Sequence, residues 1–288
     1  MQRWTRLGII AGGGQLPVKL AQTCRAAGKP YYIIRLKSYA DDTLSDFGGE
    51  ECGIAELGKI IRVLKQEECD AIVMAGLVPR PNFAALKPDW RGAALLPKAL
   101  SAARKGDGAI LNVLVDTFET EGFLVIGAEE VAEDLLAPVG HIGKVEPTQD
   151  DFSDMRKAAD VIRALGQFDI GQGAVVRNGF VLAIEAAEGT DQMLRRCADL
   201  PADMKGFEPD EKQARKGVLL KRPKPGQELR VDLPTIGVET VNGAAAAGLA
   251  GIAVEADAAL VMDREALTKL ADEYGLFIYG FQDSDFKN

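Results

Sequence analysis

Short apolar runs alternate with helical patterns through the first half of this sequence, and that alternation constrains the fold more than any other feature. Strands are predicted at residues 7–11, 30–36, 70–76 and 123–126. Helices are predicted between them, at residues 16–27 and 54–67 and within 93–105 and 109–120. Strands that alternate with helices across short loops form a parallel sheet covered on both faces. We therefore expect an α/β protein whose N-terminal domain is Rossmann-like.

The second half has a mixed α/β pattern. Asn178-Gly179 lies between apolar runs at 174–176 and 180–184, which is the strongest short-range signal for a β-hairpin. Helices are predicted near residues 149–165, 191–199, 240–249 and 264–274. Further strands are predicted at residues 218–220 and 229–231, within 252–262, and at 276–279.

The length of 288 residues favours two domains. The stretch 138–147 is rich in Pro and Gly, as linkers between domains often are. We therefore expect domains at 1–137 and 148–288 with a linker at 138–147.

Composition excludes several classes of protein. The net charge of −9 argues against a nucleic-acid binder, which needs clustered Lys and Arg. Peripheral contact with an anionic lipid surface stays compatible with it, because a basic patch acts locally. The four cysteines form no C-x-x-C pair, so we expect free thiols in a reducing compartment. The sequence shows no signal peptide pattern and no run of ~20 apolar residues, so we expect a cytoplasmic protein.

A glycine turn follows the first predicted strand, at Gly12, Gly13 and Gly14. Such a turn exposes backbone N–H groups at a helix N-terminus, where phosphate binds. The NAD fingerprint is incomplete, because Pro17 occupies the third glycine position and basic residues replace the expected acid near the end of the second strand. An NADP site and a purely structural turn remain as alternatives.

Other candidate ligand residues lie at loops of the same predicted sheet. Gly76 and Arg80 follow the third strand, at the carboxyl edge where ligands of α/β sheets bind. Asp107 precedes a helix, and it either caps that helix or contacts a ligand.

Carboxylates and cations gather in the second half. Glu185 ends an apolar strand, and Thr190 and Asp191 open the next helix. Either Thr190 or Asp191 caps that helix, or Glu185 and Asp191 together bind a hard cation. Basic residues are concentrated at 220–237, where Asp232 is either one half of a salt bridge or a metal ligand or general base. His141 is the single histidine, so a serine-type triad and a histidine-rich metal site are disfavoured.

Taken together, these stretches resemble the LpxI family of UDP-2,3-diacylglucosamine diphosphatases. The matching segments are IAGGGQLP at 10–17, KGD at 105–107, AIEAAEGTD at 183–191, GVLLK at 217–221, KPGQ at 224–227 and RVDLPTIG at 230–237. The chain departs from the family pattern at Leu77, where a Lys is expected, and at Gly108, where an acid is expected.

The resemblance implies an enzyme of lipid A biosynthesis that uses Mg²⁺ to split UDP-2,3-diacylglucosamine into UMP and 2,3-diacylglucosamine 1-phosphate. It also implies a UDP-binding N-terminal domain, a C-terminal domain for the acylated sugar phosphate, and a homodimer. The catalytic residues expected from the motifs are Asp232, Lys221 and Arg230. The expected metal ligands are Asp232, Asp191 and Glu185. The expected substrate contacts are Gly12, Gly13, Gly14, Gln15, Leu16, Gly76, Arg80, Asp107, Thr190, Gln227 and Thr235.

Overall fold

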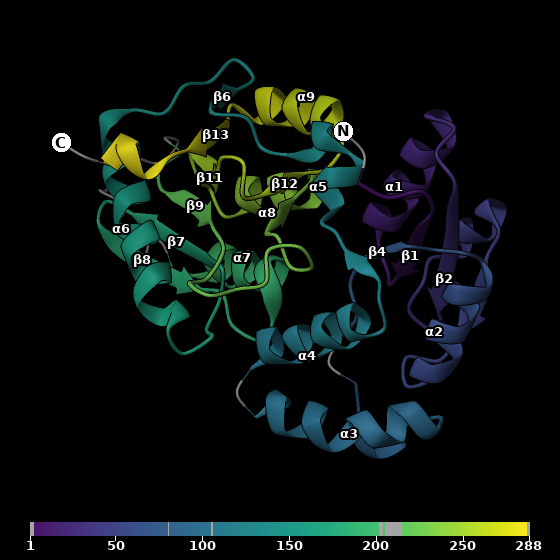
Figure 1. Cartoon of the computed structure of the whole chain (residues 1–288). Helices are drawn as coiled ribbons and strands as arrows, with labels where there is room; N and C mark the ends of the chain where they lie inside the picture. The colour runs from purple at the N-terminus through teal and green to yellow at the C-terminus, as the bar shows by residue number, and fades with distance from the viewer. Residues whose placement is uncertain (1–2, 80, 105, 202–203, 205–214, 287–288) are drawn as a thin grey trace. The chain divides into compact units, whose positions relative to one another are not determined.

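The computed structural model describes residues 3–79, 81–104, 106–201, 204 and 215–286. Contacts between Cα atoms divide the chain into two compact units. Unit 1 comprises residues 1–134 and 228–232, and unit 2 comprises residues 135–227 and 233–288. Each unit has a β-sheet of its own (Figure 1).

Unit 1 is built on a five-stranded sheet in the order β3-β2-β1-β4-β5, and every pairing in it is parallel. Its strands are β1 (Leu7–Ala11), β2 (Tyr31–Leu36), β3 (Glu50–Cys52), β4 (Ala71–Ala75) and β5 (Leu124–Val125). The chain adds strands to one side of β1 and then returns to its other side at β4. The gap between the carboxyl ends of β1 and β4 is therefore the topological switch point, where ligands of such sheets bind.

Helices cover both faces of this sheet. They are α1 (Gln15–Ala26), α2 (Leu57–Gln66), α3 (Trp90–Ala103), α4 (Asp107–Thr120) and the short α5 (Ala128–Val131). Apolar side chains of α2 and α4 share a core with alternate residues of the strands, including Ile34, Ile72 and Val125. Helix α1 contacts β1 and α5. The predicted Rossmann-like α/β arrangement is thereby confirmed.

Unit 2 contains a six-stranded mixed sheet in the order β6-β13-β11-β9-β7-β8. Strand β11 is parallel to β9 and β13, whereas β6, β7 and β8 pair antiparallel to their neighbours. The strands are β6 (Gly140–Ile142), β7 (Gly173–Arg177), β8 (Phe180–Ile184), β9 (Val218–Lys221), β11 (Gly251–Glu255) and β13 (Phe277–Phe281). Two short parallel strands, β10 (Thr235–Ile236) and β12 (Leu260–Val261), form a separate pair.

Two distinct cores cover the faces of the six-stranded sheet. Helix α6 (Gln149–Gly166) packs on one face through Met155 and Ile162. Helices α7 (Gly189–Asp199), α8 (Val238–Ala246) and α9 (Arg264–Tyr274) pack on the other. The expected mixed α/β architecture is confirmed.

The β7–β8 hairpin turns at Asn178 and Gly179, as their sequence predicts. Both residues have positive φ, at 48° and 76°. Such angles are typical of the tight turn that matches the twist of an antiparallel pair. Asp154 of α6 accepts the backbone N–H groups of both turn residues, at 2.9 and 2.7 Å. The hairpin is thus anchored to the helix beneath it.

Three expectations differ from the structure. The stretch 138–147, expected as a linker, contains β6, which pairs with β13. Residues 229–231, expected as a strand, form a turn. The segment 228–232 groups with unit 1 although the surrounding sequence belongs to unit 2. Side-chain contacts with Glu119 and the core of unit 1 account for that placement, and no local sequence pattern reports them.

Among the helices that the structure describes, none combines the length and the hydropathy needed to cross a bilayer.

Candidate functional site

The glycine turn of unit 1 brings the ends of β1 and β4 into backbone contact. Gly12 N–H donates to the Ala75 carbonyl at 2.8 Å, and Gly13 and Leu77 exchange hydrogen bonds of 2.9 and 2.8 Å. A Cβ at Gly12 would lie 2.8 Å from the Leu77 carbonyl oxygen, and one at Gly76 would lie 2.5 Å from the Gly13 carbonyl oxygen. These glycines are therefore required for the close approach of the two loops.

The same turn leaves a helix N-terminus facing the switch point. Gly14 is the N-cap of α1, has φ 85°, and supplies no side-chain cap. Gln15 is exposed and Leu16 half-buried, and Gly76 is exposed across the turn. Uncapped N–H groups at a switch point are suited to a phosphate or another anion. The predicted residues Gly12, Gly13, Gly14, Gln15, Leu16 and Gly76 thus lie along one edge of the sheet.

A second cluster lies in unit 2 and joins residues that are far apart in sequence. Lys221, the last residue of β9, donates from Nζ to Thr190 Oγ1 at 2.7 Å and to the Thr235 carbonyl at 3.3 Å. Thr190 in turn donates to Glu185 Oε1 at 2.9 Å. Since an ammonium group can only donate, the single hydroxyl proton of Thr190 must point to Glu185. The result is a directional chain from Lys221 through Thr190 to Glu185.

The strand register explains why these side chains meet. Gly173 of β7 pairs with Lys221 of β9, and its carbonyl accepts the Glu185 N–H at 2.8 Å. Because residue 173 is a glycine, it leaves the space that the Glu185 carboxylate occupies; a Cβ at Gly173 would lie 2.6 Å from Glu185 Oε2. A Cβ at Gly171, which has φ 59°, would overlap the Glu185 carbonyl oxygen.

The cluster is buried and incompletely hydrogen-bonded. Glu185 is 8% exposed and Lys221 is 5% exposed. Glu185 Oε2 is buried and has no hydrogen-bond partner among the described residues. A buried carboxylate oxygen without a hydrogen-bond donor is energetically costly, so its presence indicates a site that binds a ligand or a cation. Helix α7 also begins here, at Gly189, and adds a positive helix end.

Matches to family models span nearly the whole chain. The model of the LpxI N-terminal domain matches residues 6–135, and that of the LpxI C-terminal domain matches residues 138–279. The chain belongs to the LpxI family.

Two relatives illustrate the range of similarity. The UDP-2,3-diacylglucosamine pyrophosphatase LpxI of Caulobacter vibrioides is 54% identical over 275 residues, which cover 96% of this chain and 97% of the relative. A methionyl-tRNA formyltransferase of Bifidobacterium adolescentis is 26% identical over 169 residues, or 55% of this chain and 49% of that protein. The second match covers only part of each protein and carries no argument about activity.

The three carboxylates expected as metal ligands of this LpxI chain are not gathered in one unit. Glu185 and the exposed Asp191 lie in unit 2, whereas Asp232 belongs to the segment that groups with unit 1. Within the described parts of the chain, no three His, Cys, Asp or Glu side chains are placed to hold a metal ion together. The donor chemistry nevertheless suits a hard cation, because all three offer carboxylate oxygens and Glu185 Oε2 is unsatisfied.

Arg230, expected to be catalytic, is held by carboxylates of unit 1. Its Nε and one terminal nitrogen donate to Glu228 at 2.8 and 2.7 Å, and the other terminal nitrogen donates to Glu119 of α4 at 2.6 Å. These hydrogen bonds, with Glu228 contributing most, raise the pKa of the Arg230 guanidinium above its ordinary value. The arrangement fits a residue that fastens the segment 228–232 to α4.

The other residues expected to contact substrate either form local hydrogen bonds or lie outside the described residues. Gln227 Oε1 accepts the Lys224 N–H at 2.8 Å and closes a local turn. Thr235 contributes its carbonyl to Lys221, and its hydroxyl donates to the Leu233 carbonyl at 3.2 Å. Arg80 lies outside the described residues. Asp107 is the first residue of α4, and its side chain is not among those that the structure describes.

Sequence reasoning missed Glu129, at the start of α5. Burial raises the pKa of its carboxyl group, and its Oε2 has no hydrogen-bond partner among the described residues. The carboxylate folds back over Gly127, where a Cβ would collide with it. The doublet Glu129-Glu130 after a predicted strand was the only available signal, and charged doublets at loops are common.

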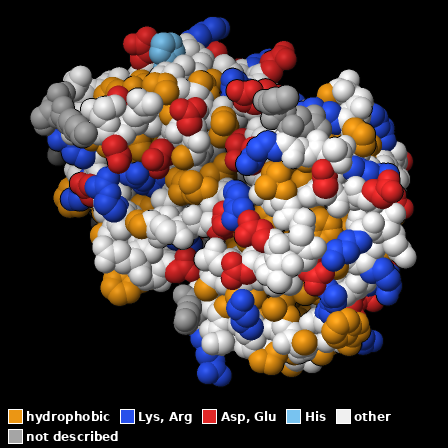
Figure 2. Space-filling view, viewed as in Figure 1, with side chains coloured by type: hydrophobic (Ala, Val, Ile, Leu, Met, Phe, Trp, Pro, Cys, Tyr) orange, Lys and Arg blue, Asp and Glu red, His pale blue; other side chains and the backbone are white. Residues whose placement is uncertain are grey.

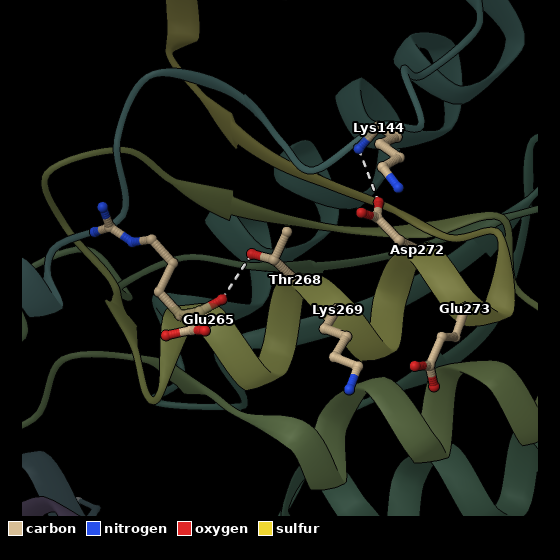
Figure 3. A pocket seen from close by; sticks show the side chains of 7 residues that line it. Lys144, Glu265, Thr268, Lys269, Asp272 and Glu273 are labelled. Carbon is tan, nitrogen blue, oxygen red and sulfur yellow. Dashed lines mark hydrogen bonds between the residues drawn. The ribbon is translucent and has the colours of Figure 1, made fainter.

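A surface hollow beside α9 contains none of the expected site residues (Figure 3). Its polar groups serve local structure: Asp272 accepts the Lys144 backbone N–H at 2.8 Å, and the Thr268 hydroxyl donates to the Arg264 carbonyl at 2.6 Å. We assign no ligand to it.

Proposed function

We propose that this chain hydrolyses the diphosphate of UDP-2,3-diacylglucosamine and releases UMP and 2,3-diacylglucosamine 1-phosphate, as a step of lipid A biosynthesis. The observation that carries the proposal is the 54% identity to a pyrophosphatase named for this substrate, over 96% of the chain. The LpxI family models, which match residues 6–135 and 138–279, include both the glycine turn and the Lys221 cluster.

The Lys221 cluster supplies positive charge for a phosphate group. Two of the three ammonium N–H groups are assigned, to Thr190 and the Thr235 carbonyl. The third has no acceptor among the described residues and can donate to a phosphate oxygen, and the N-terminus of α7 adds to the attraction. A fixed cation in a buried site stabilises the charge that develops as a diphosphate bond breaks. Thr190 and Glu185 keep the ammonium in one position, so little reorganisation is needed during the reaction.

The glycine turn of unit 1 is proposed to hold the uridine nucleotide. Its backbone N–H groups and the N-terminus of α1 suit a phosphate. The acid that would bind an NAD ribose is absent near the end of β2, where Arg35 and Lys37 lie. The whole-length match to a pyrophosphatase disfavours both an NADP-dependent oxidoreductase and a nucleotide-binding module without activity.

Mg²⁺ is proposed as the cofactor, with Glu185, Asp191 and Asp232 as its oxygen ligands. Bound there, the ion would neutralise phosphate charge and favour ionisation of a water molecule. Asp232 would orient the attacking water and accept its proton. Lys221 would hold the phosphate that the water attacks.

We also propose a homodimer that works in the cytoplasm, at the surface of the inner membrane. A diacylated substrate resides in a bilayer, so an enzyme that acts on it has to meet it at the membrane surface.

Product analysis tests the reaction directly. The protein is incubated with UDP-2,3-diacylglucosamine, with and without Mg²⁺, and phosphorus-containing products are resolved by NMR spectroscopy and mass spectrometry. We expect UMP and the sugar 1-phosphate in equal amounts, and loss of turnover when a chelator removes the metal. Intact substrate after incubation with Mg²⁺ contradicts the proposal, and bound NADPH together with hydride transfer would establish the oxidoreductase alternative.

A further inference from the structure

Helix α3 presents an apolar stripe to solvent. Trp90 is 74% exposed and Leu100 is 41% exposed. Ala93, Ala94 and Pro97 are exposed as well, at the spacing that places them on the Trp90 side of the helix. The buried residues of α3 are only Ala102 and Ala103 at its C-terminal end. A soluble helix normally turns its apolar face to the core, whereas α3 turns much of it outward.

The same helix is cationic within an acidic protein. Residues 90–104 contain Arg91, Lys98 and Arg104 and no Asp or Glu, whereas the whole chain has a net charge of −9. Lys98 lies 3.6 Å from Asp116, and since both side chains are largely exposed this ion pair contributes little. Figure 2 shows hydrophobic side chains together with Lys or Arg along the lower edge of the view, where Figure 1 places α3.

Helix α3 is held firmly at its N-terminal end. The carboxylate of Asp89, its N-cap, accepts the Gly92 N–H at 2.8 Å and the Lys59 N–H of α2 at 2.8 Å. Arg91 forms an ion pair with Glu121, and α3 packs along α4. The helix is therefore a fixed part of unit 1 that displays its stripe without unfolding.

We propose that α3 is the surface by which this enzyme docks on an anionic lipid bilayer. Trp90 and Leu100 enter the interface, and Lys98 and Arg104 contact lipid headgroups. The proposal rests on the proposed function, which requires a substrate with two acyl chains to be met at a membrane. Tryptophan favours the membrane interface, and amphipathic cationic helices bind anionic lipid through buried apolar area plus electrostatic attraction.

The charge of the stripe disfavours a second copy of the chain as its occupant. In a two-fold dimer the same surface would face itself. Lys98 and Arg104 would then meet like charges, which is unfavourable, whereas an anionic bilayer offers them opposite charge.

Tryptophan fluorescence gives a direct test, because the chain has two tryptophans, Trp4 at 6% exposure and Trp90 at 74%. On addition of vesicles of phosphatidylcholine with phosphatidylglycerol, emission should shift to shorter wavelength and acrylamide quenching should fall. Trp90→Phe should abolish both changes while Trp4 still emits. Unchanged emission of the parental protein with these vesicles overturns the proposal.

Co-sedimentation with the same vesicles tests the cations. Lys98→Gln and Arg104→Gln should each weaken binding about fivefold, the factor that corresponds to ~1 kcal/mol per cation near an anionic surface. Lys269→Gln, at an exposed position of α9, is the charge control, and Phe168→Ala, at 73% exposure, is the control for Trp90→Ala. Equal losses in test and control variants overturn the assignment to α3. The assignment is also overturned if light scattering shows a dimer that Trp90→Ala dissociates while the parental protein does not bind the vesicles.

Activity assays separate this proposal from the proposed function. Trp90→Ala and Lys98→Gln should hydrolyse a short-chain, water-soluble substrate analogue at the parental rate. They should turn over vesicle-embedded substrate more slowly than the control variants do. If the parental protein hydrolyses neither form, the proposed function fails, and the vesicle-binding measurements judge α3 independently.

Discussion

The hydroxyl of Thr190 is the only atom that connects the Lys221 ammonium to the Glu185 carboxylate in the described structure. Valine has nearly the same shape but can neither accept from Lys221 nor donate to Glu185. Thr190→Val should therefore leave the fold intact, let the ammonium shift, and lower kcat/KM by about 10²-fold. Steady-state kinetics on UDP-2,3-diacylglucosamine measures this effect.

Thr190→Ser is the matched control, since it keeps the hydroxyl and should retain most of the activity. Thermal unfolding shows whether either variant has lost stability. If Thr190→Val turns over substrate as fast as Thr190→Ser, the hydrogen-bonded chain has no part in the reaction.

Glu129 gives a pH-dependent prediction about stability. Burial raises the pKa of its carboxyl in the folded state, so the native protein holds this proton to higher pH than the unfolded chain does. Stability from this group is thus present below the unfolded pKa and is lost as pH rises through the raised folded pKa. Glu129→Gln should remove that loss and raise the melting temperature at neutral pH relative to the parental protein. The gain should shrink toward acid pH in scanning calorimetry.

Glu133→Gln is the control, because Glu133 is exposed in the short turn that follows α5 and its charge is not among the causes of the Glu129 shift. A melting temperature for Glu129→Gln below the parental value at neutral pH would falsify this account and indicate that the ionised carboxylate is stabilised in the fold.

Residue types and the family motifs together pointed to members of the Lys221 cluster. A carboxylate at the end of an apolar strand and a lysine in a basic motif both indicated function, and both Glu185 and Lys221 lie in one cluster. The bridging role of Thr190 could not be predicted, because it depends on the register of β7 with β9. Neither could the need for Gly171 and Gly173, whose missing side chains matter only once Glu185 lies beside them.

At the scale of elements, strand β7 shapes the cluster through Gly173. A methyl group there would lie 2.6 Å from the flexible end of Glu185, so the carboxylate moves while the backbone pairing survives. Gly173→Ala should lower activity by about 10²-fold through the displaced Glu185 while circular dichroism stays unchanged. Gly237→Ala is a control with room, since its nearest atom would be 3.7 Å away. Equal activities of the two variants would show that the space at Gly173 is unimportant.

The turn at residues 228–231 offers a second test at this scale. If Arg230 fastens this segment to α4, Glu119→Gln and Arg230→Gln should both lower kcat, because each removes the ion pair that joins the segment to α4, although Arg230→Gln also removes the pair with Glu228. If Arg230 instead contacts substrate, Arg230→Gln should be far more damaging, and its effect should appear mainly in KM. Kinetics of the two single variants and the double variant separate these outcomes.

Strong local sequence signals predicted helices, strands and turns well. Segments whose structure depends on contacts with distant parts of the chain were predicted poorly. Asn178-Gly179 between apolar runs predicted the hairpin, because the turn requires positive φ that these residues tolerate. Strand β3 was missed since its sequence Glu50-Glu51-Cys52 is charged and lies at a sheet edge. Residues 229–231 alternate like a strand but pair with no strand in the part of the chain that the structure describes, and the ion pairs of Arg230 hold them as a turn.

At the scale of the whole molecule, the alternation of strands and helices predicted the parallel sheet of unit 1, and the motifs indicated the family. The path of the chain between units was not predictable. It passes from unit 1 to unit 2 after Asp134, returns at Glu228, and leaves again after Asp232. Tertiary contacts of Arg230 and Val231 with unit 1 reveal that excursion. The residue most needed for turnover is expected on it.

Asp232 is the last residue of the segment 228–232. In sequence it follows Lys221 and precedes the rigid Pro234. Hydrolysis of a diphosphate requires a water molecule to be oriented and deprotonated. The cationic side chains of lysine and arginine, as at Lys221 and Arg230, offer no acceptor for that proton. A carboxylate can, whether it acts on the water directly or as a metal ligand. We therefore expect Asp232→Ala to fold and bind substrate normally, while kcat falls by about 10²–10⁴-fold.

Asp232→Asn and Asp232→Glu divide the possible causes of that loss. The amide keeps the size and hydrogen-bonding shape but cannot take a proton, so it should be as inactive as Asp232→Ala at saturating Mg²⁺. The longer acid keeps the basicity and should recover part of the rate, with the same slope of rate against pH on the acidic side. Calorimetry of UMP and substrate binding shows whether affinity is retained. A kcat for Asp232→Ala within about threefold of the parental value would remove Asp232 as the central group, because a positioned base contributes far more than that.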